Sequence, residues 1–373
     1  MSNHQDSTDG NRPGAHSLQE IVSQPACWGS CLEQLPAIIR SERIIESFAG
    51  AREWLFVGCG SSFYLALAAA ASWNKISGLR ARAVPASEVL LYPDLTLSAA
   101  KEMAAVVISR SGRTSEAVRA AEQLQRDRRI PTLGITCAPA TPLQQVTSRT
   151  LVLSAADESS TVMTRSFTSM LLGLQYLAAR IANDMTMIQA LEGLPAMAEA
   201  VLPGLHQRIK DFSEHRFADH ICLGQGPFFG LACECALKLT EMSVSYAQSY
   251  HTLEFRHGPK SVVGPETLIL FLVSEHGYDS EREVLQEMKA LGCTTLTLVN
   301  RADDRLRAAS DLLFEFGFDL PEVAQLAAFV FAGQLMGLYT GLKKGLDPDH
   351  PRNLSRVVIL NESSSESPDH AAL

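Results

Sequence analysis

The chain lacks an excess of positive charge. Its 373 residues carry 32 Lys and Arg against 41 Asp and Glu, a formal net charge of −9. Nucleic acids and anionic membrane surfaces are held by clustered cations, so we expect neither as a partner. No uninterrupted apolar run reaches the roughly 18 residues of a membrane span, and the polar start MSNHQDSTDGNRPGAHS has no apolar segment typical of a secretory signal. We therefore expect a cytoplasmic protein.

The chain also lacks the motifs of metal and nucleotide sites. Its eight cysteines are scattered, and neither Cys27/Cys31 nor Cys233/Cys235 has His or Cys neighbours at zinc spacing. No GxxxxGK[ST] sequence is present, which argues against a nucleoside triphosphate. These absences predict free thiols, no metal and no cofactor.

What the chain does contain is a repeated strand–turn–helix pattern. The apolar run ending at Val57 meets the turn GCGSS and then an alanine-rich helical stretch, and the run ending at Leu223 meets Gly-Gln-Gly and a second small-residue helix. Gly58 and Gly224, which open the two turns, lie 166 positions apart. A fixed offset of this kind indicates duplication of a structural unit.

A second pair of segments keeps nearly the same offset. Apolar strands lead into Ser109 and Ser274, which lie 165 positions apart, and each is followed by a helical stretch and another apolar strand. Short continuous apolar strands alternating with helices are typical of parallel sheets covered on both faces. The predicted fold class is α/β, with two tandem doubly wound parallel-sheet domains related by internal duplication. The predicted boundaries are a disordered tail at 1–17, an N-terminal domain at 18–200 with a helical lead-in, a C-terminal domain at 201–362 and a tail at 363–373.

The first copy carries a candidate anion site. Ser109, Arg110, Ser111, Gly112 and Thr114 belong to SRSGRT, between a predicted strand and the start of a helix. Hydroxyls and free N–H groups at a helix start bind phosphate, and ligands of such sheets lie beyond the carboxyl ends of the strands. Serines and threonines also cap helices without binding anything. Three hydroxyls around a glycine favour the anion site.

Two further observations support an anion site over simple helix capping. Ser62 starts a helix beside the same expected crevice. The matching loop of the second copy, SEHGYD, has acidic residues and fewer hydroxyls, so the fold itself does not require them.

The second copy places charges on an apolar helix. Glu234, Lys238 and Glu241 have the spacing i, i+4, i+7 and therefore share one helix face. Unpaired buried charges are expensive, so charges in apolar surroundings are paired or catalytic. A structural Glu–Lys–Glu ladder on a solvated face is the alternative. The loop EFRHGPK that follows adds His257 between a helix stop and Gly-Pro, which makes this imidazole a candidate for acid–base chemistry.

The motifs GCGSS, SRSGRTSE, ECALKLTE, EFRHGPKS and DPDHPRNLS together resemble the double sugar isomerase (SIS) domain family. The chain resembles the isomerase domain of glucosamine-6-phosphate synthase and the amino-sugar-phosphate deaminase–isomerases, including the tagatose-6-phosphate ketose/aldose isomerase group. The likeness extends from about Leu18 to Leu360. The synthase's glutaminase domain has no counterpart in this sequence, so we do not expect the chain to draw ammonia from glutamine by itself.

The resemblance implies roles for individual residues. Glu241 matches the carboxylate that moves a proton between C1 and C2, and Lys238 matches a lysine of the same site. His257 matches the ring-opening histidine, which the family's synthase takes from the other subunit. This implies a homodimer with shared active sites. The matched substrate-binding positions are Ser62, Ser109, Ser111, Thr114 and Thr161, together with Arg110, where the synthase has glutamine.

One position departs from the synthase. In Pro351-Arg-Asn-Leu-Ser355-Arg356, Arg356 stands where the synthase has a lysine that forms a Schiff base with the ketose. A guanidinium stays protonated and cannot form that imine. We therefore expect Arg356 to act electrostatically, with Ser355 beside it, and the substrate to bring its own nitrogen.

The predicted function is an enzyme that converts glucosamine or galactosamine 6-phosphate to the ketose 6-phosphate with release of ammonia. The alternatives are a phosphosugar aldose–ketose isomerase, a fructosamine-phosphate deglycase, the isomerase subunit of a glutamine–fructose-6-phosphate transaminase, and a non-catalytic phosphosugar sensor.

Overall fold

Two parallel five-stranded sheets with the same strand order form the framework of the computed structural model, which describes residues 12–97 and 102–360. The first sheet runs β2-β1-β3-β4-β5 and the second runs β7-β6-β8-β9-β10, so every strand has a counterpart in the other copy. The predicted α/β class and the internal duplication are confirmed. The strands are β1 Glu53–Gly58, β2 Arg80–Pro85, β3 Met103–Ile108, β4 Thr132–Thr136, β5 Arg149–Val152, β6 Asp219–Gly224, β7 Ala247–His251, β8 Thr267–Leu272, β9 Thr294–Val299 and β10 Leu312–Glu315.

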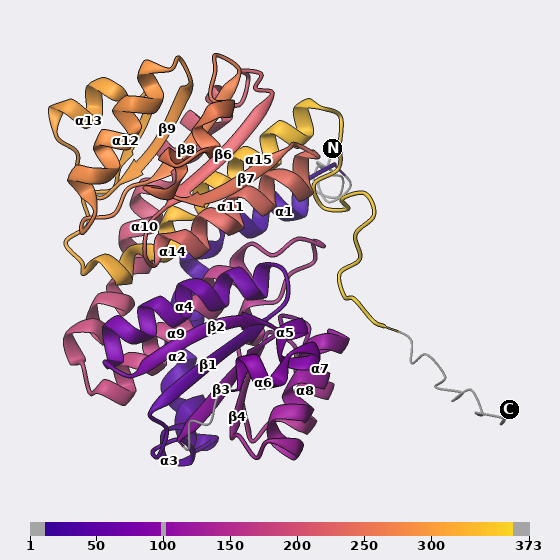
Figure 1. Ribbon diagram of the computed structural model, residues 1–373. Coiled ribbons are helices and arrows are strands. Elements are labelled where there is room, and N and C mark those ends of the chain that lie inside the picture. The colour runs from indigo at the N-terminus through magenta and orange to yellow at the C-terminus, as the bar shows by residue number, and fades with distance from the viewer. Residues whose placement is uncertain (1–11, 98–101, 361–373) are drawn as a thin grey trace, which may run out of the picture.

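Helices connect the strands and cover both faces of each sheet (Figure 1). The first part of the chain contains α1 Ala15–Val22, α2 Gln24–Ser41, α3 Ile44–Ser47, α4 Ser61–Ser77, α5 Ala86–Leu91, α6 Pro93–Thr96, α7 Ser115–Glu122, η2 Gln123–Asp127, α8 Pro142–Val146, η3 Ser154–Ala156 and α9 Arg165–Ala182. The second part contains α11 Phe228–Ser243, η4 Glu254–Arg256, η5 Pro259–Val262, α12 Tyr278–Ala290, α13 Asp304–Ala309, η6 Glu322–Gln325, α14 Leu326–Phe329 and α15 Phe331–Lys343. Between them runs α10 Met185–Phe212, and the proposed boundary at 200/201 falls inside this helix.

The core reflects the alternation of side chains along each strand. In β1, Trp54 and Phe56 join the large central core with α2, α4 and α9, whereas Leu55 and Val57 join a smaller core with α5, α7 and α8. The second sheet divides in the same way, and its inner face joins the same central core through α11 and α15. Helices from both copies, among them α4 and α11, therefore lie between the two sheets in one shared core, as Figure 1 shows.

The close approach of two of these helices depends on a glycine. A Cβ at Gly230 of α11 would lie 2.6 Å from the Ala68 nitrogen and 2.6 Å from the Tyr64 oxygen of α4. Each of these helices follows the first strand of its copy, so the packed pair α4–α11 joins the duplicated units at equivalent positions.

The two ends of the chain meet near α1 and α15. Asp349 accepts hydrogen bonds from the His16 and Ser17 backbone N–H groups and from the Ser17 hydroxyl, at 3.0, 2.7 and 2.6 Å. The predicted disordered tail at 1–17 is therefore too long, because α1 begins at Ala15 and Ser17 is fully buried. Residues 1–11 and the predicted tail at 363–373 lie outside the described residues.

One segment is apolar enough to be mistaken for a membrane span. Within the described ranges, Glu322–Lys343 has the length and hydropathy of a spanning helix, but 89% of its apolar window is buried inside the protein. Its second half, α15, packs on α11 in the central core, which accounts for its apolar composition.

Candidate active site

The loop between β3 and α7 provides hydroxyls and unpaired N–H groups at a helix start. Among the described residues, the backbone N–H groups of Arg110, Ser111 and Thr114 have no hydrogen-bond partner. Ser109 Oγ lies 3.3 Å from Thr114 Oγ1, so the hydroxyls converge on one side of the loop. Gly112 has φ +61°, and a Cβ there would collide with the Thr141 side chain. The arrangement suits a tetrahedral anion.

The start of α4 lies beside this loop because β1 and β3 are neighbours in the sheet. Ser62 is buried in the second position of α4, and its Oγ lies 3.9 Å from Met163 Sδ in the segment that precedes α9. Ser62 and the Ser109–Thr114 loop thus meet at the point where the strand order reverses, the usual ligand position in such sheets.

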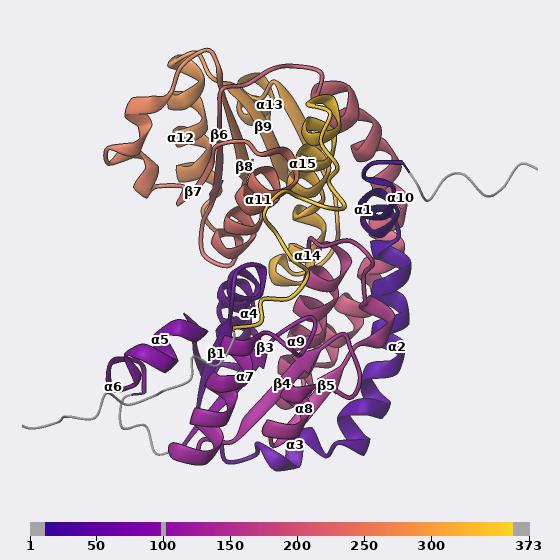
Figure 2. The ribbon, with the colours of Figure 1, turned by 90° about the vertical axis from the view of Figure 1, so that its right-hand side faces the viewer.

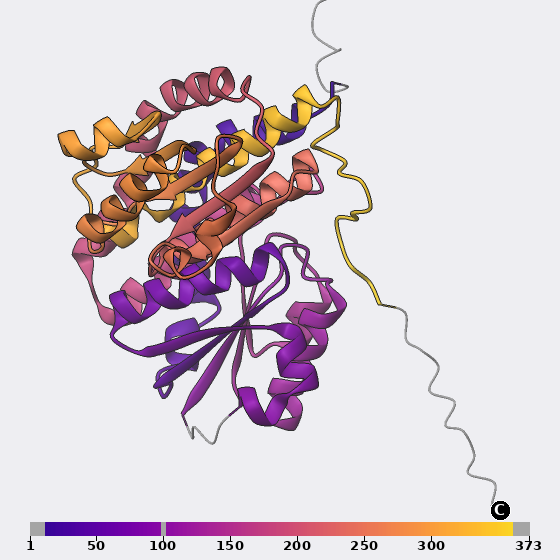
Figure 3. The ribbon, with the colours of Figure 1, turned by 45° about the horizontal axis from the view of Figure 1, so that its top comes forward.

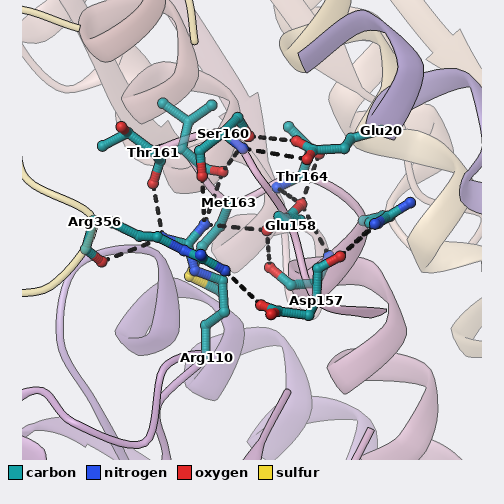
Figure 4. Close-up of polar contacts among 12 residues, drawn as sticks. Glu20, Arg110, Asp157, Glu158, Ser160, Thr161, Met163, Thr164 and Arg356 are labelled. Atoms are coloured by element: carbon teal, nitrogen blue, oxygen red, sulfur yellow. Dashed lines mark hydrogen bonds and ion pairs between the residues drawn. The ribbon is translucent and has the colours of Figure 1, made fainter. Parts of the chain in front are cut away.

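The Arg110 side chain extends toward the 157–164 segment and Arg356 (Figure 4). Its Nη1 donates to Glu158 Oε2 at 3.2 Å and to the Val162 carbonyl at 2.9 Å. Its Nη2 donates to the carbonyls of Thr161 and Arg356 at 2.8 and 3.3 Å. Both terminal nitrogens are engaged by oxygens of the chain itself, so we interpret Arg110 as a positioning residue that ties the 157–164 segment to the C-terminal segment.

Two buried carboxylates, Glu158 and Glu20, also hold the 157–164 segment in place through hydrogen bonds. Glu158 accepts hydrogen bonds from the Thr164 N–H and hydroxyl, both at 2.7 Å, and from the Ser166 hydroxyl. Glu20 of α1 accepts from the Ser160 N–H at 3.2 Å and from its hydroxyl. Burial, followed by the nearby charge of Glu158, raises the pKa of Glu20. These contacts fix the backbone around Thr161.

The charged face of α11 is buried and paired. Lys238 is fully buried; its Nζ lies 3.4 Å from Glu234 Oε1 and forms an ion pair with Glu241. The solvated-ladder alternative is therefore wrong for Glu234 and Lys238. The Glu241 side chain alone keeps 19% of its surface exposed, so among the three it is the one open to a ligand.

The pKa values on this face follow from burial and pairing. Burial raises the pKa of Glu234 to about 7, and the Lys238 ammonium limits the rise. Burial acts to lower the pKa of Lys238, but the two carboxylates outweigh it and leave the value raised. Lys238 therefore stays cationic next to Glu241.

The N-terminal domain is tied to this face by Ser61. Ser61 Oγ donates to Glu234 Oε1 at 3.1 Å and accepts from Lys238 Nζ at 3.3 Å. Because Ser62 follows directly, the helix start that lies beside the Ser109–Thr114 loop also contacts the charged face of α11.

The segment that follows α15, drawn in yellow in Figure 2, extends from the second domain to the first. Arg356 Nη2 lies 2.6 Å from Asp157 Oδ1, and the Val358 carbonyl accepts from the Ser115 N–H at 3.2 Å. Ser355 is exposed and its hydroxyl donates to the Val357 carbonyl at 2.9 Å. The structure thus brings Arg356 to the 157–164 segment, whereas Ser355 makes no hydrogen bond to that segment.

His257 lies apart from these groups in this single chain. It is exposed at the end of η4, and within the described residues its imidazole makes no hydrogen bond. In the part of the chain that the structure describes, no group of three or more His, Cys, Asp or Glu side chains is placed to hold a metal ion.

Sequence reasoning missed several residues that shape the site. They are Glu20, Ser61, Asp157, Glu158 and Asp349. Ser61 stood next to a chosen residue in GCGSS and Glu158 stood in a Ser-rich turn, so each had a weak signal. Asp349 stood in the DPDHPRNLS motif, but the motif did not reveal its role, and Glu20 had no signal at all. The partners of both residues lie far away along the chain.

Together, the duplicated doubly wound fold and the hydroxyl-lined loop define the class of this protein: a tandem α/β protein with a candidate anion site at the switch point of its first sheet. The SIS domain model matches residues 47–180 and 220–339. The chain belongs to the SIS domain family.

Several characterised proteins are similar over most of the chain. A glutamine–fructose-6-phosphate aminotransferase (isomerizing) of Helicobacter pylori is 28% identical over 355 residues, which is 92% of this chain and 58% of that protein. The chain thus spans little more than half the length of the curated relatives it matches.

Among solved structures, glucosamine-6-phosphate deaminase from Thermotoga maritima is 27% identical with a TM-score of 0.73, covering 92% of this chain and 100% of that one. Tagatose-6-phosphate ketose/aldose isomerase from Escherichia coli shares the fold, with a TM-score of 0.80, 23% identity and coverage of 97% and 100%.

Proposed function

We propose that this protein converts an amino-sugar 6-phosphate, glucosamine or galactosamine 6-phosphate, to the ketose 6-phosphate and ammonia. The observation that carries the proposal is Glu241: a partly exposed carboxylate, ion-paired to a buried lysine that also contacts Ser61 at the helix start beside the hydroxyl-lined loop. A base held at a fixed distance from a phosphate anchor is what proton transfer between neighbouring sugar carbons requires.

The chemistry follows in balanced steps. The ring opens to the C1 aldehyde, with His257 moving the proton between O1 and the ring oxygen. Glu241 removes the C2 proton while O1 gains a proton from water, giving an enaminol. Glu241 then returns its proton to C1, and the iminium formed at C2 gives one proton back to the solvent and becomes an imine. Water adds to this imine and ammonia leaves, which yields the ketose phosphate. Lys238 stays cationic and holds the Glu241 carboxylate in place through their ion pair.

Arg356 favours an amino-sugar substrate over a ketose that must gain nitrogen. Its guanidinium is paired with Asp157 and cannot form an imine with a ketone. An amino sugar carries its own nitrogen and needs no lysine at this position.

We further propose that the active enzyme is a homodimer in which His257 completes the site of the partner subunit. Support comes from the exposure of His257 and from its separation from Glu241's contacts in one chain. An isologous dimer would complete both sites at once.

Simple aldose–ketose isomerisation of a phosphosugar is the second candidate, favoured by the same base and anchor. Incubation with glucosamine 6-phosphate and galactosamine 6-phosphate, with ammonia and ketose measured separately, distinguishes the two. Equal amounts of ammonia and ketose are expected. Interconversion of unaminated aldose and ketose phosphates without ammonia from either amino sugar would refute deamination.

A further inference from the structure

The duplication gives the molecule a second crevice at the switch point of the second sheet. A cavity of about 600 Å³ lies there, lined by the end of α4, the turn before α11, the loop after β8, and η6. The turn and the loop are the counterparts of the GCGSS turn and the SRSGRT loop in the first copy.

The helices α4 and α11 connect the two crevices. The start of α4, at Ser61, meets the middle of α11, at Glu234 and Lys238, in the candidate active site. The other end of α4, at Lys75, and the turn before α11, at Gln225, line the second cavity. Figure 3 shows the helix layer between the two sheets that carries both sites.

In the second crevice, the Glu322 carboxylate occupies the position that corresponds to the candidate anion site of the first crevice. Glu322 Oε1 accepts hydrogen bonds from the N–H groups of Glu275 and His276, at 2.6 and 3.2 Å. Their counterparts in the first copy, Arg110 and Ser111, have N–H groups without partners among the described residues. A phosphate would meet a negative charge here, so the second crevice does not suit a phosphorylated ligand.

The groups that remain available can both donate and accept hydrogen bonds. Gln225 Oε1 is buried and has no hydrogen-bond partner, which is uncommon for a buried polar atom. Within residues 12–97 and 102–360, the Lys75 ammonium and the His276 imidazole form no hydrogen bond or ion pair. Hydroxyl groups, which donate and accept, match such a mixed lining.

We propose that this cavity is a second binding site for an unphosphorylated sugar. Its hydroxyls donate to Gln225 Oε1 and accept from Lys75 and His276, and the Glu322 carboxylate excludes phosphate. The proposal stands independently of the reaction proposed above, because it uses none of the residues of that site.

Calorimetric titration of the full chain with glucosamine, galactosamine and glucose tests the proposal. We expect at least one of these sugars to bind, and Gln225→Leu and Lys75→Met each to weaken that binding about tenfold, since each removes one hydrogen-bonding partner. Ser111→Ala is the matched control in the first crevice and should leave sugar binding unchanged. Binding lost in Ser111→Ala but kept in the other two variants, or no binding of any of the three sugars, would overturn the proposal.

A titration with inorganic phosphate tests whether Glu322 occupies the anion position of the second crevice. The parent protein should bind one phosphate per chain, at the first crevice. Glu322→Ala frees the N–H groups of Glu275 and His276 and should create a second phosphate site, seen as a second binding step. One phosphate per chain in both proteins would contradict the assignment of Glu322 to the anion position.

Discussion

Ser61 and Glu234 are hydrogen-bonded across the two copies of the duplicated fold. Ser61 opens the helix after β1, Glu234 lies in the helix after β6, and the two side-chain oxygens are 3.1 Å apart. Lys238 contacts both residues and also pairs with Glu241. The position of the candidate base therefore depends directly on the start of the helix that carries Ser62.

The hydroxyl loop should act mainly on the binding of the phosphate group. Ser111→Ala and Thr114→Ala each remove a hydrogen bond to a charged group, which is worth roughly 1.5–3 kcal/mol. We expect KM for the phosphorylated sugar to rise by the factor that corresponds to this free energy. Activity on the unphosphorylated sugar should stay unchanged. Steady-state kinetics on both substrates checks this, and unchanged constants in two folded variants would reject the anchor.

Glu241→Gln should separate chemistry from binding. The amide keeps the shape of the side chain but cannot take the C2 proton, and Lys238 retains Glu234 as a partner. We expect kcat to fall by at least the roughly 10²–10⁴-fold that acid–base catalysis supplies, with KM little changed. Solvent deuterium should no longer enter at C1 or C2. If turnover and exchange persist as in the parent, Glu241 is structural and His257 becomes the next candidate for the base.

Mixed subunits test whether the site is shared. His257→Ala and Glu241→Gln chains are each expected to be nearly inactive alone. If His257 serves the partner's site, co-refolded mixtures regain activity, because half of the sites in each mixed dimer contain both intact groups. His257→Asn should impair cyclic substrates more than an open-chain analogue. Sedimentation of a fully active monomer under assay conditions would rule out sharing.

Arg110→Gln should destabilise the protein through its buried partner. Glu158 is fully buried, and loss of the guanidinium leaves its charge without a cation, which costs about 3–5 kcal/mol. The double variant Arg110→Gln/Glu158→Gln removes both charges and should recover part of the loss. Urea unfolding of the three proteins measures this. A single variant as stable as the parent would show that Arg110 does not hold the 157–164 segment.

The raised pKa of Glu281 predicts that the stability of the protein depends on pH. Burial raises its pKa in the folded protein to about 7, against 4.5 in the unfolded chain. Between these values the Glu281 carboxyl binds its proton more tightly in the folded protein than in the unfolded chain. The contribution of Glu281 to the free energy of unfolding is therefore greatest below about pH 4.5 and falls as the pH rises to about 7. The full loss is roughly 3 kcal/mol.

Glu281→Gln should remove this part of the pH dependence. The difference in free energy of unfolding between pH 5 and pH 8, measured by urea denaturation, is expected to be smaller in the variant than in the parent. Asp311→Asn serves as the comparison, because the pKa of Asp311 is lowered from 3.8 in the folded protein, so this group stays ionised between pH 5 and pH 8 and its loss should leave the difference unchanged. Identical pH profiles for the parent and Glu281→Gln would contradict the prediction.

The sequence by itself was enough to predict the duplication, the positions of six of the ten strands (β1, β3, β4, β6, β8 and β9), and the shared face of Glu234, Lys238 and Glu241. Strand alternation, helical spacing and glycine turns are local properties, and a repeat at a fixed offset can be seen without any structure. The hydroxyl loop was found for the same reason, since its residues are neighbours in the chain.

Only the tertiary structure decided what the remaining residues do. Arg110 lies in the hydroxyl loop by sequence, yet its guanidinium reaches the carbonyl of Arg356, 246 positions away. The Ser61–Glu234 bond and the carboxylate of Glu322 in the second crevice likewise join distant parts of the chain. Local patterns set the face on which a side chain lies, but its partner is set by how the two copies pack against each other, and one sequence carries no direct signal of that packing.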